Sequence, residues 1–183
     1  MTGKKILVVE DEFITASDIQ STLKGMGFEV PAIADTGENA VQLAGEHRPD
    51  AILMDISLKG KMNGITAAAA IRERYGIPVV YLTGQSDDAT ITRALETEPF
   101  GYIIKPFEGR EMKISIEMAL YKHALDRELR DSEETNRVLL NATNDVMFLL
   151  DTEKRFLAVN EALAKKAGVP VDALSGISAY DLV

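Results

Sequence analysis

The sequence predicts an α/β fold in which a parallel sheet is covered by helices on both faces. From residue 4 to about residue 124, short apolar runs alternate with segments whose apolar residues recur every three or four positions. Turns marked by glycine or proline separate the two kinds of segment. The apolar runs suit central strands that are buried on both faces. Strands that alternate with helices in this way are typical of a doubly wound parallel sheet.

Five strands and five helices are expected in this region. The strands are expected at residues 6–9, 30–34, 51–54, 79–82 and 102–104. The helices are expected at residues 13–26, 37–47, 64–74, 87–96 and from 109 onward. Gly27, Pro49 and Gly76 mark the predicted ends of the first three helices. Five βα units of this kind form a flavodoxin-like sheet with strand order 2-1-3-4-5.

The fifth helix extends beyond this domain. Residues 111–142 contain no glycine or proline, and one stripe recurs at steps of three or four residues. The stripe consists of Ile114, Met118, Tyr121, Leu125, Leu129, Ser132, Asn136 and Leu139. It suits a two-stranded coiled coil, although two members are polar and one additional step of four breaks the strict heptad. A single helix that packs on its own domain is the alternative.

After Asn141 the pattern changes to that of a β-hairpin. Apolar residues 146–150 and 156–159 flank a polar turn at residues 151–154, and a short helix is expected at 161–167. A lone hairpin is marginally stable in water, so we expect this tail to belong to a longer module that continues past Val183. The predicted parts are a domain at 1–122, a coiled-coil linker at 123–142 and the start of a second domain at 143–183.

The composition excludes several kinds of site. The 183 residues include no cysteine and only two histidines, His47 and His123, which rules out disulfides, thiolate zinc sites and imidazole metal cages. A net charge of −9 provides no basic surface for nucleic acid or an anionic membrane. No apolar run approaches the roughly 18 residues that span a bilayer, and Met1 to Val9 lacks the cleavable hydrophobic stretch of a secretion signal. We expect a cytosolic protein.

Polar residues follow four of the five predicted strands, at the sheet edge where such folds bind ligands. They are Glu10 and Asp11 after the first strand, Asp55 after the third, Thr83 after the fourth and Lys105 after the fifth. Two carboxylates about 4 Å apart repel by roughly 4 kcal/mol at an effective dielectric constant of 20, so clustered acids need a proton or a cation. Mg²⁺ fits, because it takes oxygen ligands and uses only one or two carboxylates.

These residue types suit the transfer of a phosphoryl group to a carboxylate. Asp55 would attack phosphorus in line and form an acyl phosphate, while the cation and Lys105 offset charge on the equatorial oxygens. Thr83 would supply a neutral hydrogen-bond donor. An aspartate at a single strand end is usually a helix cap or a turn residue, so the prediction depends on the joint occurrence at four strand ends.

Four motifs resemble those of the receiver domain of two-component response regulators: KILVVEDE, AILMDISL, VVYLTG and GYIIKPF. The resemblance covers about residues 4–122. It implies that Asp55 is the phosphoacceptor, that Asp11 binds Mg²⁺ directly and that Glu10 acts largely through water. The backbone carbonyl of Ser57 would complete the protein ligands.

The resemblance also assigns a switch and partners. Thr83 matches the hydroxyl that senses the phosphoryl group, Lys105 the lysine that pairs with it, and Tyr102 the aromatic residue that swings inward on activation. The Lys105–Pro106 bond should be cis. A histidine kinase or phosphotransfer protein would be the donor, and a homodimer would form through the fourth and fifth helices and the coiled coil. The segment after Asp55 lacks the proline common in the family and looks one residue longer.

Residues 129–183 are similar to the helical lead-in and opening third of a PAS sensory domain. The segments LRDSEETNRVLLNATNDVMFLLD and LAVNEALAKKAG carry this resemblance, and Asn160 at the start of the last helix fits the pattern. No PAS ligand can be assigned. An ordinary hairpin and helix that close a regulator are the alternative.

We expect a phosphoacceptor and not an enzyme, since any output enzyme would lie beyond this stretch of sequence. A phosphatase of the haloacid-dehalogenase type would carry a second aspartate two residues after the nucleophile, where this chain has Ser57. A ligand-sensing PAS protein with a degenerate receiver is another alternative. A nucleic-acid regulator is disfavoured because the tail after Ala142 has six acidic and four basic residues. We expect neither nucleic acid nor membrane as a partner.

Overall fold

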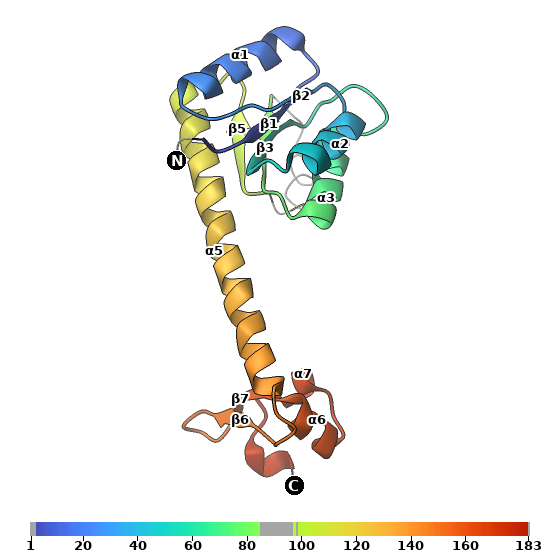
Figure 1. Ribbon diagram of the computed structural model, residues 1–183, viewed down its shortest axis with the longest axis vertical. Helices are drawn as coiled ribbons and strands as arrows, with labels where there is room; N and C mark the ends of the chain where they lie inside the picture. Colours follow the sequence, from blue (N-terminus) through green and yellow to red (C-terminus); the bar gives the residue numbers. More distant parts are fainter. Residues whose placement is uncertain (1–2, 85–96, 98, 183) are drawn as a thin grey trace. The chain divides into compact units, whose positions relative to one another are not determined.

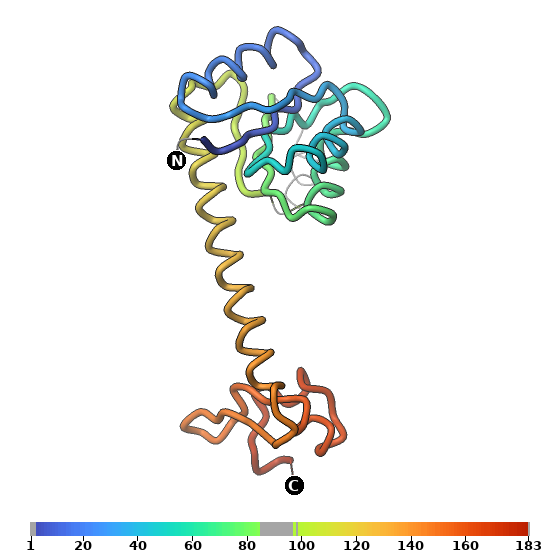
Figure 2. Tube along the Cα trace, in the orientation of Figure 1, coloured from blue at the N-terminus to red at the C-terminus, as the bar shows by residue number. Residues whose placement is uncertain are grey.

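The computed structural model describes residues 3–84, 97 and 99–182, and every structural statement concerns these residues. The chain divides into two compact units, Met1–Leu125 and Asp126–Val183. Figures 1 and 2 trace the chain through the two units. None of the described helices is both long enough and apolar enough to cross a membrane.

The first unit contains a parallel sheet of five strands in the order β2-β1-β3-β4-β5. The strands are β1 (Ile6–Val9), β2 (Ile33–Ala34), β3 (Ala51–Asp55), β4 (Val79–Thr83) and β5 (Gly101–Ile104). The predicted flavodoxin-like fold class and strand order are therefore confirmed.

The second strand is shorter than predicted. The sequence suggested residues 30–34, whereas β2 contains only Ile33 and Ala34. Pro31 has no backbone N–H to donate to a neighbouring strand, so pairing cannot run through it unbroken. Upstream of the proline, Glu29 forms only an isolated bridge with Lys5.

Four described helices accompany the sheet: α1 (Phe13–Gly25), α2 (Gly37–His47), α3 (Gly64–Tyr75) and α5 (Gly109–Asn141). The helix predicted at residues 87–96 lies outside the described residues. Side chains cap two helices, because Thr36 accepts a hydrogen bond from the amide of Asn39 and Asn63 from that of Thr66. Gly76, with φ of +64°, ends α3 in the left-handed conformation that glycine adopts easily.

The sheet separates two hydrophobic cores. Ile6 and Val8 on β1 face a core completed by α1 and α5, while Leu7 and Val9 face a core completed by α2 and α3. Figure 1 shows α2 and α3 together on one side of the sheet and α1 with the first turns of α5 on the other. All four β1 residues are fully buried. This explains why the strands lack the apolar–polar alternation of a half-exposed sheet.

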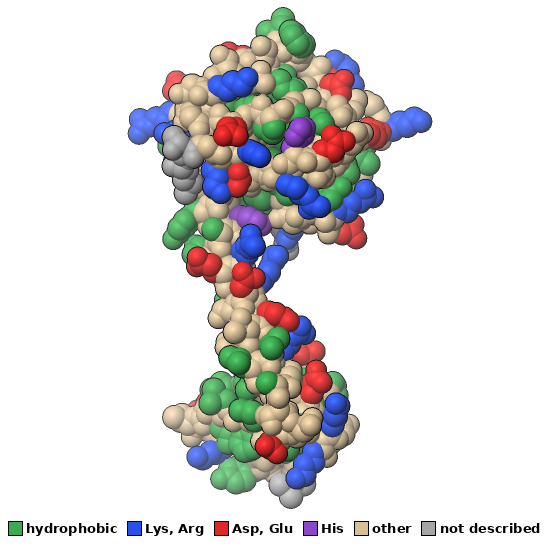
Figure 3. All heavy atoms as spheres, in the orientation of Figure 1, with side chains coloured by type: hydrophobic (Ala, Val, Ile, Leu, Met, Phe, Trp, Pro, Cys, Tyr) green, Lys and Arg blue, Asp and Glu red, His purple; other side chains and the backbone are tan. Residues whose placement is uncertain are grey.

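The predicted stripe lies on the exposed face of α5. The apolar members of the stripe are 45–66% exposed, whereas Met112, Ile116 and Ala119 are buried against the first unit. The exposed members are Ile114, Met118, Tyr121, Leu125, Leu129 and Leu139. Figure 3 shows hydrophobic side chains reaching the surface along this helix and over the second unit. The stripe residues of the first unit, from Ile114 to Leu125, therefore do not belong to its hydrophobic core.

The second unit contains the predicted hairpin, formed by the antiparallel strands β6 (Phe148–Leu150) and β7 (Phe156–Val159). It continues with α6 (Glu161–Ala167), α7 (Val171–Leu174) and a 3₁₀ turn at Ala179–Leu182. The first strand begins two residues later than the expected residue 146. A small core of five buried residues joins these elements: Phe156, Val159, Leu163, Ala164 and Leu174.

Asn160 is the buried polar centre of this unit. Its Oδ1 accepts hydrogen bonds from the amides of Met147 and Leu163, at 3.0 and 3.1 Å. Its Nδ2 donates to the carbonyl oxygens of Leu140, at 3.1 Å, and Asp145, at 2.8 Å. Both donors and both acceptor positions of the amide are thus used. One side chain joins the end of α5, the start of the hairpin and the start of α6.

Candidate metal and phosphoryl site

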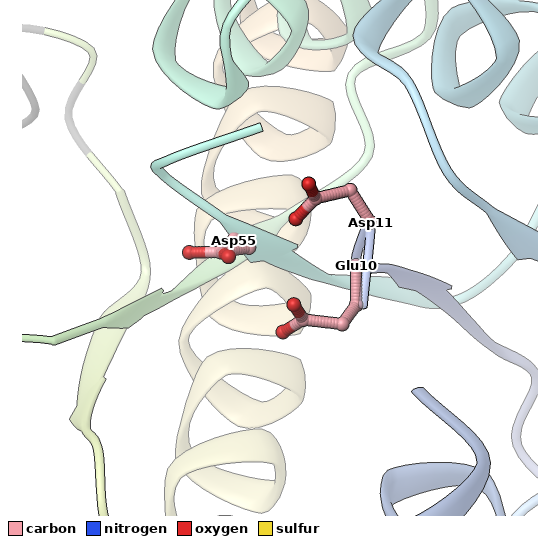
Figure 4. A group of neighbouring side chains, drawn as sticks. All are labelled: Glu10, Asp11 and Asp55. Atoms are coloured by element: carbon pink, nitrogen blue, oxygen red, sulfur yellow. The ribbon is translucent and has the colours of Figure 1, made fainter. Parts of the chain in front are cut away.

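Three carboxylates converge at the carboxyl edge of the sheet. Glu10 and Asp11 directly follow β1, and Asp55 is the last residue of β3. The two strands are parallel neighbours in which Val9 pairs with Met54, so their ends meet. One oxygen from each carboxylate lies within 4.8 Å of the others, and Figure 4 shows the side chains pointing into a common space.

Burial makes this cluster costly. Glu10 and Asp55 are only 3% and 6% exposed, and Asp11 is partly buried. Like charges in a poorly hydrated position repel more strongly than they would in water. The chain therefore places three acids where at least one compensating cation is needed.

Lys105 supplies part of that compensation from the end of β5. Its Nζ lies 2.6 Å from Oε2 of Glu10 and 3.1 Å from Oδ2 of Asp55. The backbone holds it there, because the Lys105 amide donates to the carbonyl of Thr83 at 2.7 Å. The Lys105–Pro106 peptide bond is cis, as predicted.

The ionisation of these groups follows from their surroundings. Burial, and then the charge of Asp55, raise the pKa of Glu10 above its ordinary value, while Lys105 opposes this shift. Burial alone would lower the pKa of Lys105, but its hydrogen bond to Glu10 and the charge of Asp55 outweigh burial and raise it. Lys105 is consequently held in its charged form.

Thr83 and Tyr102 lie on the strands next to the cluster. Thr83 ends β4, is 5% exposed, and its Oγ1 lies 3.1 Å from the carbonyl oxygen of Gly84. A Cβ on the next residue, Gly84, would meet no atom of the described residues within 4 Å. The Tyr102 ring lies 5.9 Å from that of Tyr81, and its buried hydroxyl has no hydrogen-bond partner among the described residues. Burial raises the pKa of Tyr102.

The segment after Asp55 is held close to the acid cluster. The Ser57 amide donates to Oδ1 of Asp55 at 3.2 Å. A Cβ on Gly64 would collide with the carbonyl oxygen of Asp55, so glycine is required where α3 begins. The role of the Ser57 carbonyl as a metal ligand stays a prediction.

Lys59 contacts the acid cluster, and the sequence did not lead us to predict this contact. Its Nζ lies 2.8 Å from Oδ2 of Asp11. The signal that could have indicated it is a lysine in the segment that lacks the family's proline. The site thus contains three carboxylates and two lysines, which leaves an excess of negative charge.

The donor set fits a magnesium ion. Carboxylate oxygens are the ligands that Mg²⁺ prefers, and a divalent ion would reverse the excess negative charge. A zinc site would instead be expected to use cysteine or histidine, and the described residues offer an all-carboxylate cluster here.

Comparisons with known proteins agree with this geometry. The response regulator receiver domain family matches residues 6–117. The DNA-binding response regulator MtrA of Mycobacterium tuberculosis is 35% identical over 120 residues, which cover 66% of this chain and 52% of MtrA. The transcriptional regulatory protein PdtaR of the same species is 32% identical over 117 residues, covering 64% of this chain and 57% of PdtaR. The chain thus matches only about half the length of these relatives.

Solved structures give the same result. The signal receiver domain of a modulated diguanylate cyclase from Desulfovibrio desulfuricans G20 has a TM-score of 0.66 and 35% identity, covering 68% of this chain and 98% of that domain. The N-terminal domain of a response regulator/sensory box/GGDEF three-domain protein from Carboxydothermus hydrogenoformans has a TM-score of 0.62 and 37% identity. The match covers 67% of this chain and 98% of that domain. The chain belongs to the response regulator receiver domain family.

Proposed function

We propose that this chain accepts a phosphoryl group on Asp55 in the presence of Mg²⁺ and passes the resulting change through α5. The observation that supports this most directly is the convergence of Glu10, Asp11 and Asp55 with Lys105 in contact with two of them. The donor would be a phosphohistidine of a histidine kinase or phosphotransfer protein. The carboxylate oxygen of Asp55 forms a bond to phosphorus as the nitrogen–phosphorus bond of the donor breaks.

Each group at the site would have one task. Asp11 and Asp55 would bind the metal directly, with Glu10 and the Ser57 carbonyl as further partners. A bound Mg²⁺ would offset negative charge on the phosphoryl oxygens. Lys105, 3.1 Å from Asp55, is close enough to pair with a phosphoryl oxygen once Asp55 is modified.

The proposed response begins at Thr83 and Tyr102. The Thr83 hydroxyl, at the carboxyl end of β4, would donate to a phosphoryl oxygen on Asp55. Tyr102 lies on β5, the strand next to Thr83, and its buried hydroxyl has no hydrogen-bond partner among the described residues; its side chain would move toward the site when Thr83 does. Satisfying a buried hydroxyl in a new position would favour the activated arrangement.

The phosphodonor would dock at the start of α1. Phe13 and Ile14 are 84% and 78% exposed and follow the acid cluster directly in the chain. A donor protein has to place its phosphohistidine against Asp55, so it must cover this neighbourhood. Ile14→Ser should slow transfer from the donor protein more than fivefold but leave transfer from acetyl phosphate nearly unchanged. Equal slowing with both donors would contradict the docking role.

The output would run through a dimeric coiled coil. The apolar members of the stripe are exposed in the single chain, and a second copy would bury them. The proposed parts are a receiver at 1–122, a linker at 123–142 and the start of a PAS-like sensory domain at 143–183. The Carboxydothermus relative, whose name combines a response regulator with a sensory box, supports this order. Leu125→Glu should shift sedimentation from dimer to monomer, and a wild-type monomer at high concentration would contradict the coil.

Two alternatives have less support. A phosphatase of the haloacid-dehalogenase type needs a carboxylate two residues after the nucleophile, and Ser57 offers none. A ligand-sensing PAS protein with a degenerate receiver would lack part of the phosphoryl site. Here the three acids, Lys105 and Thr83 are all present.

The test is incubation with Mg²⁺ and acetyl phosphate, followed by intact mass measurement. The wild type should gain one phosphoryl group, and Asp55→Asn should gain none. Asp35→Asn, which removes a carboxylate that follows β2, is the matched control and should behave as the wild type. Equal modification of wild type and Asp55→Asn would contradict the proposal.

A further inference from the structure

Lys59 contacts the acid cluster but has no part in the chemistry proposed above. Its Nζ is 2.8 Å from Oδ2 of Asp11, whereas Lys105 contacts Glu10 and Asp55. Its side chain is 83% exposed and that of Asp11 is 12% exposed. Each carboxylate of the cluster therefore has a lysine contact, and the lysine on Asp11 comes from the surface.

The backbone around Lys59 is anchored. Leu58 is buried, at 8% exposure, and Gly60 turns the chain with φ of +121°. A Cβ on Gly37 would lie only 2.6 Å from the carbonyl oxygen of Met62, so the end of this segment packs tightly against the start of α2. The segment thus holds the Cα of Lys59 near Asp11, while its four-carbon side chain is free to swing.

The contact places a monovalent cation where the proposed site needs a divalent one. Because the Lys59 side chain is largely exposed, its ammonium group can exchange Asp11 for water more readily than a buried lysine could. Mg²⁺ carries twice the charge and binds carboxylate oxygens directly, so it can displace the ammonium group from Asp11. The displaced lysine remains tethered nearby and repels the bound cation.

We propose that Lys59 is a tethered counter-ion of Asp11 that competes with the divalent cation and lowers the Mg²⁺ affinity of the site. Without the cation, Lys59 neutralises Asp11 and ties the segment after β3 to the end of β1. With the cation, Lys59 is released to solvent. The inference rests on the proposed function, because it requires a cation at Asp11.

Calorimetric titration of the full chain with Mg²⁺ tests this role. Lys59→Met should lower the dissociation constant for Mg²⁺ about three- to tenfold. This is the size expected when a screened positive charge several ångströms from a divalent ion is removed. The matched control is Lys61→Met, which removes the same charge from an exposed position two residues away and should change the constant less than twofold. In an Asp11→Asn background, the effect of Lys59→Met should shrink, because the competition for the Asp11 carboxylate is gone and only the repulsion between Lys59 and the cation remains.

The possible results distinguish the role of Lys59 from the cation site of the proposed function. Equal dissociation constants for wild type and Lys59→Met, or equal tightening by both lysine variants, would overturn the role of Lys59 and leave the cation site intact. No Mg²⁺ binding by wild type, or an unchanged constant in Asp11→Asn, would overturn the cation site and the inference with it. Lys59→Gln repeats the test with a polar side chain.

Discussion

Each unit of the chain contains a buried polar centre, and the two are built in opposite ways. In the second unit Asn160 is fully buried and uses both donors and both acceptor positions in hydrogen bonds to four backbone groups. In the first unit three carboxylates gather around two lysines and keep an excess of negative charge. One centre is complete within the chain, whereas the other needs a further cation.

The difference indicates that Asn160 has a structural role and the acid cluster a functional one. A satisfied buried amide joins three elements and leaves nothing for a ligand to gain. A cluster of like charges lowers the stability of the protein without its ligand and binds a cation in return. The contrast predicts that changes at Asn160 act on stability, while changes at the acid cluster act on binding and phosphoryl uptake.

The largest loss of stability is expected from Asn160→Ala. It would leave the amides of Met147 and Leu163 and two carbonyl oxygens without their partner, at a cost of about 2–4 kcal/mol. Hydrogen exchange at the amides of Phe156 and Ala164, which bond to backbone oxygens, would measure the loss.

Asn141→Ala is the matched control for Asn160. The exposed Asn141 side chain accepts one hydrogen bond, from the amide of Glu161 at 2.8 Å, so its loss should cost about 0.5–1 kcal/mol. Similar exchange rates in the two variants would show that Asn160 is not the centre of this unit.

A smaller loss of stability, with a large loss of activity, is expected from Lys105→Met. The change leaves Glu10 and Asp55 without their shared cation, and because Lys105 is partly exposed we expect a cost of about 1–3 kcal/mol. Urea unfolding would measure this cost. The rate of modification by acetyl phosphate should fall more than tenfold, because the charge that pairs with the phosphoryl group is lost. An unchanged rate would remove Lys105 from the chemistry.

The smallest effect is a pH dependence caused by Glu10. Burial and then Asp55 raise the pKa of Glu10, so the folded protein holds this proton more tightly than the unfolded chain. The contribution favours folding below the ordinary pKa of 4.5 and is lost as the pH rises through the raised value. In metal-free buffer, the stability of the wild type relative to Glu10→Gln should therefore fall as the pH rises above the ordinary pKa of 4.5. A rise over that range would mean that Lys105 outweighs burial.

Much of the fold could be predicted because local sequence determines it. The bounds of α2 and α6 agree with the predicted residues 37–47 and 161–167, since Thr36 and Asn160 cap their starts. The bounds of β2 were predicted less well, because the apolar run was followed through Pro31, although the missing N–H of a proline already argues against a continuous strand there.

Only those residues of the candidate site that lie at strand ends could be predicted from the sequence. The topology brings Glu10, Asp55 and Lys105 together once the strand order is known, so their meeting follows from sequence and fold class. The contact between Lys59 and Asp11 depends on the path of an irregular segment, which periodicity does not describe. The four hydrogen bonds of Asn160 likewise depend on tertiary packing between residues up to 20 positions apart.

Unfolding of the full chain by urea, with and without Mg²⁺, tests the convergence of the three acids most directly. At a Mg²⁺ concentration of about 100 times the dissociation constant, the free energy of unfolding of the first unit should rise by about 2.7 kcal/mol in the wild type. The rise should be largely lost in Asp11→Asn and in Asp55→Asn. Equal unfolding curves with and without Mg²⁺ in the wild type, or an undiminished rise in both variants, would contradict a shared cation site.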